Sequence, residues 1–186
     1  MEKTFEEAFE LLKKYIKKEN MIAHSLASYS VMKAIANRLN KDETQWGLAG
    51  LLHDIDVEIT NANPEIHGIE GAKILKNEGY DDEIVEAVKM HNEMATKQER
   101  SKDFHYALAA GETITGLITA TALVYPSKNI ADVKVKSIIK RMKEKSFAAS
   151  VSRDTIMECE KINIPLHEFA ELALKAMQGI DIKKQH

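Results

Sequence analysis

Four histidines and two acidic residues have the clearest chemical potential in this sequence. They are His24, His53, Asp54, His67, His91 and Glu112. Each lies in or beside a stretch whose apolar residues recur at helical spacing. Imidazole and carboxylate groups without a thiol form the ligand set that is typical of hard or borderline divalent metals. The residue types therefore point to a metal centre between helices.

His24 is expected to face the core of the protein. It shares a helical face with Ala27, Val31 and Ile35, at offsets of three, seven and eleven residues. A single histidine in such a position is more often a hydrogen-bonded core residue than a ligand. His24 therefore indicates a metal only together with the other candidates.

The adjacent His53 and Asp54 follow the apolar run Leu48–Leu52, near the expected end of a helix. Neighbouring side chains can reach one point only if the helix end itself faces that point. The small residues one turn earlier, Ala49 and Gly50, would let another helix approach closely. The plainer alternative is that Asp54 and the nearby Asp56 only help to terminate the helix.

Glu112 gives the strongest indication of a metal. It lies within Ala107–Ala122, a stretch that is apolar on nearly every side. An unpaired carboxylate in such a helix would cost several kcal/mol or become protonated. A buried lysine or arginine could compensate it. A divalent cation shared with His24, His53 and Asp54 would satisfy all four residues together.

His67 and His91 allow several interpretations. His67 precedes Gly68 and Gly71, and His91 ends an apolar stripe that begins at Ile84. Either histidine could bind a second metal, contact a substrate phosphate or act as a general acid. Each could also be a histidine at the surface end of a helix.

The elements that must position these residues are expected to be helices. The predicted helices cover about residues 5–16, 21–39, 43–54, 63–75, 81–91, 101–124 and 130–143, and two more begin at Ser152 and Pro165. Asn63 and Pro64 form an expected N-cap and first-turn pair. The chain has 186 residues, of which 44% are hydrophobic, and this suits one all-α domain over residues 1–186 with its core at about 20–155.

Composition limits the classes of partner. A formal charge of −3 gives no reason to expect binding to nucleic acid or to an anionic membrane. The longest apolar stretch, Tyr106–Tyr125, contains Glu112, four threonines and two glycines, so a buried helix is expected there in place of a membrane span. A single cysteine, Cys159, and the absence of a signal-peptide pattern favour the cytoplasm.

A basic segment could meet a charged substrate. Residues 127–153 contain eight lysines or arginines and two acids, in a chain whose net charge is −3. Such a run is usually a solvated helix face. Lys145 and Arg153 flank the small residues 146–152, where the backbone can approach an anion. They are therefore the predicted phosphate-binding residues.

In order and context, these residues resemble the H…HD…D pattern of the HD-domain metal-dependent phosphohydrolases, especially the small bacterial HDIG-type subgroup. The resemblance lies in His24, in the stretch Leu51–Asp56 and in the run that begins at Glu112, and it spans about residues 20–155. The region from His67 to His91 is similar to subgroups with extra histidines, including the dinucleoside-tetraphosphate hydrolase and HD-GYP types. Glu112 stands where aspartate is usual, and Asp56 stands where glycine is frequent.

The resemblance implies a compact multi-helix bundle with a metal site between central helices. It implies that His24, His53, Asp54 and Glu112 bind the metal, with Asp54 bridging if two ions bind. His67 and His91 would complete a second site or hold the phosphate. One or two ions of Mn, Fe, Mg, Co or Ni are expected, and Zn is less expected.

The implied activity is hydrolysis of a nucleotide or other small phosphorylated compound by a metal-activated water, with His67, His91 and Asp54 as the catalytic residues. The alternative is a catalytically weak or inactive domain that binds nucleotide or transmits a signal and holds a structural metal. The protein could be a monomer or a homodimer.

Overall fold

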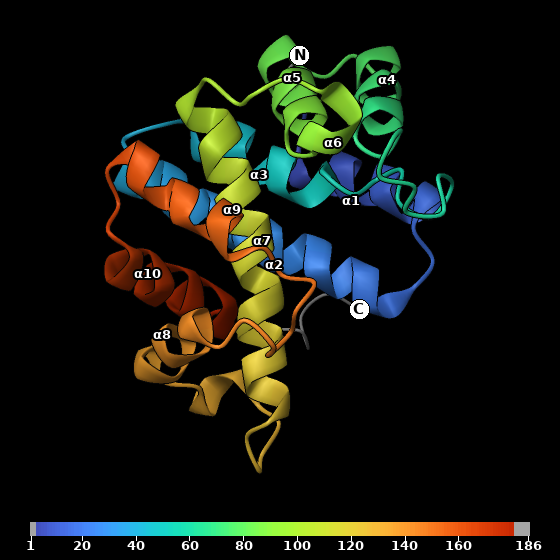
Figure 1. Cartoon of the computed structure of the whole chain (residues 1–186). Coiled ribbons are helices and arrows are strands. Elements are labelled where there is room, and N and C mark those ends of the chain that lie inside the picture. Colours follow the sequence, from blue (N-terminus) through green and yellow to red (C-terminus); the bar gives the residue numbers. More distant parts are fainter. Residues whose placement is uncertain (1–2, 181–186) are drawn as a thin grey trace.

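Two long helices, α2 (Glu19–Arg38) and α7 (Asp103–Leu123), pack against each other at the centre of the fold (Figure 1). The computed structural model describes residues 3–180, which form ten α-helices and two 3-10 helices without a strand. The predicted all-α class is therefore confirmed. The expected single domain over residues 1–186 stays a prediction.

The other elements surround this central pair. They are α1 (Phe5–Tyr15), α3 (Glu43–Leu52), α4 (Ile69–Asn77), α5 (Asp82–Met90), α6 (Glu93–Thr96), η1 (Ile130–Asp132), α8 (Val135–Lys143), α9 (Arg153–Met157), η2 (Glu158–Ile162) and α10 (Leu166–Gln178). Helices α4, α5 and α6 lie together at one end of the molecule, and α8 and α10 lie at the other (Figure 1).

Local sequence explains where several helices begin. The side chains of Asp42, Asp81 and Ser152 accept hydrogen bonds from backbone N–H groups in the first turns of α3, α5 and α9. Such N-caps satisfy donors that have no partner within the helix. The predicted starts at Asp81 and Ser152 are therefore confirmed to within one residue.

Two glycines allow α2 to approach its neighbours closely. A Cβ atom at Gly50 of α3 would lie 2.5 Å from the carbonyl oxygen of Ser28, and one at Gly111 of α7 would lie 3.0 Å from Ile35. Larger residues at either position would push the helices apart. As expected from the small residues before His53, this close contact brings three candidate ligands together.

Helix α7 is mostly buried along its length. Its buried side chains include Leu108, Ile114, Leu117 and Ile118, each 0% exposed. Among residues 3–180, no helix has both the length and the apolar character that a bilayer crossing requires.

The predicted start of a helix at Asn63 is wrong. Residues 53–68 form a series of turns, and α4 begins only at Ile69. The Asn63 side chain accepts a hydrogen bond from the backbone N–H of Glu65, which closes a local turn. The backbone at Gly68 has φ +90°, which no α-helix contains. His67 is therefore presented by a turn.

The helix predicted over residues 130–143 is also divided. Residues Ile130–Asp132 form the short η1, and the extended backbone of Val133 and Lys134 separates it from α8. The Asn129 side chain accepts from the N–H of Ala131 and so starts a separate turn.

Candidate metal centre

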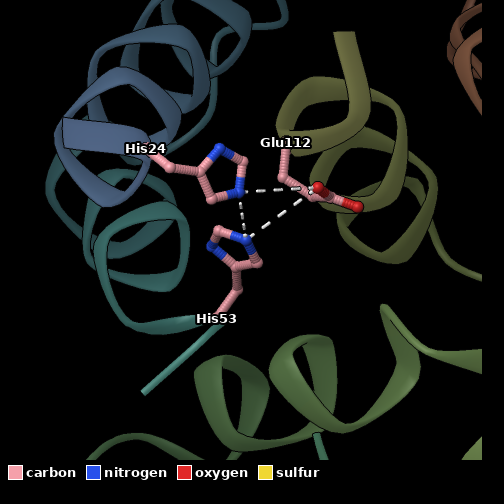
Figure 2. Close-up of side chains that lie close together, drawn as sticks. All are labelled: His24, His53 and Glu112. Atoms are coloured by element: carbon pink, nitrogen blue, oxygen red, sulfur yellow. Dashed lines mark hydrogen bonds and ion pairs between the residues drawn. The ribbon is translucent and has the colours of Figure 1, made fainter. Parts of the chain in front are cut away.

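Three of the predicted ligands form a first trio, His24, His53 and Glu112 (Figure 2). His24 projects from α2, His53 caps the end of α3, and Glu112 projects from α7. The two Nε2 atoms are 3.1 Å apart, and they lie 3.8 Å and 3.9 Å from Oε2 of Glu112. Their ligand atoms all lie within 4.8 Å of one another, as ligands of a single ion would.

The remaining predicted ligands form a second trio, Asp54, His67 and His91. His91 follows the last residue of α5, and His67 lies in the turn before α4. The Nε2 atoms of the two histidines are 3.1 Å apart. Oδ1 of Asp54 lies 3.0 Å from Nε2 of His67 and 3.6 Å from Nε2 of His91.

Asp54 lies between the two trios. While Oδ1 faces the second trio, Oδ2 lies 3.5 Å from Nε2 of His24 and 3.3 Å from Nε2 of His53. One carboxylate thus offers a different oxygen to each side. This is the position that the bridging role expected of Asp54 requires.

All four histidines direct Nε2 into the cluster and have an oxygen atom close to Nδ1. His53 donates to the carbonyl of Gly50, His91 to the carbonyl of Val88, His24 to the hydroxyl oxygen of Thr115, and His67 to the carboxylate of Asp56. A proton on Nδ1 leaves the lone pair on Nε2 free to bind a metal. The donor set therefore fits divalent cations.

The cluster attracts positive charge. Burial lowers the pKa of His53, but the carboxylates of Asp54 and Glu112 outweigh it and raise this pKa to about 9. Burial likewise opposes protonation of His67, yet Asp54 and Asp56 raise its pKa to about 10. Burial and the nearby His53 lower the pKa of His24.

Asp54 stays ionised in this setting. Burial would raise the pKa of its carboxyl group, but the charge and hydrogen bonds of His53, together with those of His67, lower it well below the usual value. The carboxylates consequently give each trio a negative electrostatic potential, which either a proton or a metal cation can neutralise.

The cluster is open on one side. The His53 side chain is 0% exposed, whereas the side chains of His24 and Glu112 are 22% and 20% exposed. Glu112 is therefore less buried than its apolar surroundings in sequence predict. The neighbouring Thr113 and Gly116 are also partly exposed, because this face of α7 is incompletely covered. Solvent can therefore reach the cluster from the side of His24 and Glu112.

The predicted phosphate-binding residues lie on either side of the turns between α8 and α9. Lys145 is exposed in these turns, and Arg153 is the first residue of α9. Arg153 instead donates from its two terminal nitrogens to five backbone carbonyls, those of residues 141, 144, 147, 148 and 151. Its remaining donor, Nε, is buried. This side chain therefore organises the loop, and its role in phosphate binding stays a prediction.

Sequence reasoning missed three residues that support the ligands. Thr115 lies one turn after Glu112, accepts from His24 and donates to the carbonyl of Glu112. Asp56 contacts His67. Arg100 donates to the carbonyls of Met90 and His91 and forms a bidentate ion pair with Glu158. The spacing of Thr115 from Glu112 was a usable signal, whereas nothing near Arg100 in sequence indicates its partners.

Comparison with known proteins finds relatives that share part of the chain. Ribonuclease Y of Mycoplasma mycoides is 30% identical over 97 residues, which are 52% of this chain and 22% of that protein. The tRNA (cytidine(56)-2'-O)-methyltransferase of Thermoplasma volcanium is 35% identical over 82 residues, 44% of this chain and 24% of that protein. An uncharacterized protein of Methanocaldococcus jannaschii is 35% identical over 92 residues, 47% of this chain and 53% of that protein.

The chain thus spans about a fifth of the length of the ribonuclease Y protein that it matches. No solved structure matches it. The family model described as the HD domain matches residues 21–123, a range that begins just before His24 and ends after Glu112. This range contains every member of both trios, and the chain belongs to the HD-domain family.

Proposed function

We propose that this protein is a metal-dependent phosphohydrolase that acts on a nucleotide or another small phosphorylated compound. The observation that carries the proposal is the pair of trios joined by Asp54, in which four imidazole nitrogens and three carboxylate oxygens converge. Membership of the HD-domain family supports a metal-dependent hydrolase.

The ligand roles follow from the positions of the donor atoms. His24, His53, Glu112 and Oδ2 of Asp54 would hold one divalent cation. Such a cation polarises a phosphoryl oxygen and supplies a water nucleophile at neutral pH. The exposed edges of His24 and Glu112 leave room for the phosphate to approach. His53 lies on the buried side of the site, which solvent does not reach.

The second trio and the loop after α8 would contribute to substrate binding. His67 and His91, with Oδ1 of Asp54, would hold a second cation or contact the phosphate directly. Lys145 is the basic side chain that we assign to the substrate phosphate, because it is exposed and Arg153 fixes the turns that carry it.

The substrate class rests on the family and on the relatives. Ribonuclease Y and the tRNA methyltransferase are named for RNA substrates, and the match covers 22% and 24% of their lengths. The formal charge of −3 favours a small substrate over a polyanion. A substrate screen should therefore include mononucleotides, dinucleoside polyphosphates, generic phosphoesters and a short RNA.

Metal content and turnover, measured on the same samples, test the proposal. The protein is stripped of metal, reloaded with Mn²⁺ and assayed over this screen. His53→Ala and Glu112→Ala should each lose bound Mn²⁺ and most of the activity. His167→Ala is the matched control, because His167 is an exposed histidine on α10. Stoichiometric Mn²⁺ in both cluster variants would contradict the assignment of the ligands.

The alternative function is a binding or signalling module with a structural metal. The position of Glu112, whose Oε2 is 3.8 Å and 3.9 Å from the imidazole nitrogens, keeps this alternative relevant. A protein that binds Mn²⁺ and nucleotide but hydrolyses no compound in the screen would favour the module.

A further inference from the structure

Asp56 is a fully buried carboxylate that lies beside the second trio. It is 0% exposed and accepts three hydrogen bonds. Oδ1 accepts from Nδ1 of His67 at 2.6 Å. Oδ2 accepts from the backbone N–H groups of Gly68 at 2.8 Å and Gly71 at 2.7 Å. Both oxygens are therefore occupied by groups that can only donate in this arrangement.

His67 differs from the other three histidines in the partner of Nδ1. The partners of His24, His53 and His91 are neutral oxygens of a hydroxyl or a carbonyl group. Only His67 donates to a carboxylate. A carboxylate fixes the orientation and tautomer of an imidazole and makes its other nitrogen a stronger ligand. The second trio thus has a supporting group that the first trio lacks.

We infer that Asp56 is a positioning residue that fixes the orientation and tautomer of His67 and so strengthens the second trio as a cation site. This inference rests on the proposed metal-dependent function and deepens it, because it assigns His67 and His91 to a second cation in preference to a direct phosphate contact. Asp56 does not touch the cation. It holds the proton on Nδ1 of His67, so that Nε2, which lies 3.0 Å from Oδ1 of Asp54, is the nitrogen that would give up its proton to bind a cation.

The hydrogen bonds of Asp56 explain why an amide cannot replace it. An asparagine has one acceptor oxygen and one NH₂ group. If the oxygen faces Gly68 and Gly71, the NH₂ group faces Nδ1 of His67 and requires that nitrogen to accept. The proton then moves to Nε2, and the metal-binding lone pair is lost. If the amide is reversed, two donors oppose the glycine N–H groups.

Metal titration of Asp56→Asn tests the inference. We expect two Mn²⁺ per chain in the parent protein and one in Asp56→Asn, with the affinity of the second site reduced by about 10- to 100-fold. Asp81→Asn is the matched control, because Asp81 also accepts a backbone N–H at the start of a helix but belongs to neither trio. It should keep two ions.

A spectroscopic measurement on the parent protein keeps the test independent of whether the variant folds. With Zn²⁺ as a diamagnetic probe, long-range ¹H–¹⁵N correlation should show His67 protonated at Nδ1. A proton at Nε2 of His67, or a second-site affinity in Asp56→Asn within about twofold of the parent, would overturn the inference.

The same titration separates this inference from the proposed function. If the parent binds one Mn²⁺ that His53→Ala removes, the second site is refuted while the metal-dependent function stands. If the parent binds no divalent metal, the proposed function fails, and this inference fails with it.

Discussion

Glu112 lies farther from the imidazole nitrogens of the first trio than Asp54 does. Its Oε2 is 3.8 Å and 3.9 Å from His24 and His53, whereas Oδ2 of Asp54 is 3.5 Å and 3.3 Å away. Even with the longer glutamate side chain, the carboxylate from α7 approaches these nitrogens less closely than Asp54 does.

A shorter acid at this position should bind metal less well. In Glu112→Asp the carboxylate withdraws by one methylene, so we expect Mn²⁺ affinity at the first trio to fall about tenfold, which is about 1.4 kcal/mol. Isothermal titration measures the change. Glu160→Asp, at an exposed residue of η2, is the control. Tighter binding in Glu112→Asp would show that the glutamate is a weakened substitute for the shorter residue.

The raised pKa values of His53 and His67 predict how stability depends on pH. The folded metal-free protein holds these protons more tightly than the unfolded chain, in which histidine has a pKa of about 6.5. The resulting stabilisation is complete below that pH and is lost as the pH rises through about 9 for His53 and about 10 for His67. We expect the free energy of unfolding of the metal-free protein to fall between pH 6.5 and 10.

Metal-loaded protein should show the opposite trend, because cations bind only the deprotonated imidazoles. Urea unfolding at several pH values, with and without Mn²⁺, measures both trends. His67→Ala should flatten the curve of the metal-free protein. A parent curve that is already flat over this range would contradict the assigned pKa shifts.

Residue types, together with the family resemblance for His67 and His91, predicted which side chains meet, but not how they are supported. His24, His53, Asp54 and Glu112, as well as His67 and His91, are chemically conspicuous, and the structure brings all of them together. The supporting role of Asp56 could not be predicted, because its partners, Gly68 and Gly71, are 12 and 15 residues away and carry no side chain. The contacts of Arg153 could not be predicted either, because its acceptors are backbone carbonyls, which no sequence pattern reveals.

At the level of elements, the start of α4 couples backbone conformation to the second trio. Gly68 is the N-cap residue of α4 but has no side chain with which to cap it, and Asp56 serves that purpose from a distant position. There is also little room at Gly68, because an added Cβ would lie 3.2 Å from Cε1 of His91. This glycine thus lies between two segments that carry ligands.

Replacing this glycine should damage stability and metal binding together. A Cβ at Gly68 would lie 3.2 Å from Cε1 of His91, and the left-handed backbone would cost about 1–2 kcal/mol in Gly68→Ala. Gly79→Ala is the matched control, because Gly79 has φ +77° with nothing within 4 Å. Unfolding and Mn²⁺ titration of both variants should show a similar loss of stability but a loss of metal only in Gly68→Ala.

The end of α5 depends on a buried ion pair. Arg100 is 4% exposed and Glu158 is 14% exposed, and Arg100 also caps the last carbonyls of α5 beside His91. Arg100→Met leaves Glu158 unpaired, so we expect a loss of about 3–5 kcal/mol in the free energy of unfolding. Arg38→Met, which removes the half-exposed pair with Glu168, should cost about 0–1 kcal/mol. Equal losses in urea unfolding would contradict this difference in burial.

Most helices were predictable because their caps and apolar spacing are local. The errors fall where contacts between distant residues decide the backbone. Residues 53–68 form turns because Asp56 and Asn63 close them, although Pro64 resembles a helix start in sequence. Residues 133 and 134 interrupt a stretch whose spacing suggests one continuous helix.

At the scale of the whole molecule, the two trios connect elements that are far apart in sequence. Their members come from α2, the ends of α3 and α5, the turn before α4, and α7. A cation that binds only the folded protein should therefore stabilise all of these elements together. At a Mn²⁺ concentration of 100 times Kd, the gain should be about 2.7 kcal/mol. Thermal unfolding measures it, and His53→Ala should abolish the part due to the first trio.

The two oxygens of Asp54 have a consequence for breathing motions of the helices. Oδ2 faces one trio and Oδ1 faces the other, so the two trios share one side chain. The distance between these two ligand oxygens is set by the bonds of a single carboxylate group. When the end of α3 shifts, it carries one edge of each trio in the same direction. Each trio thus contains one oxygen that is held at a fixed covalent separation from an oxygen of the other trio.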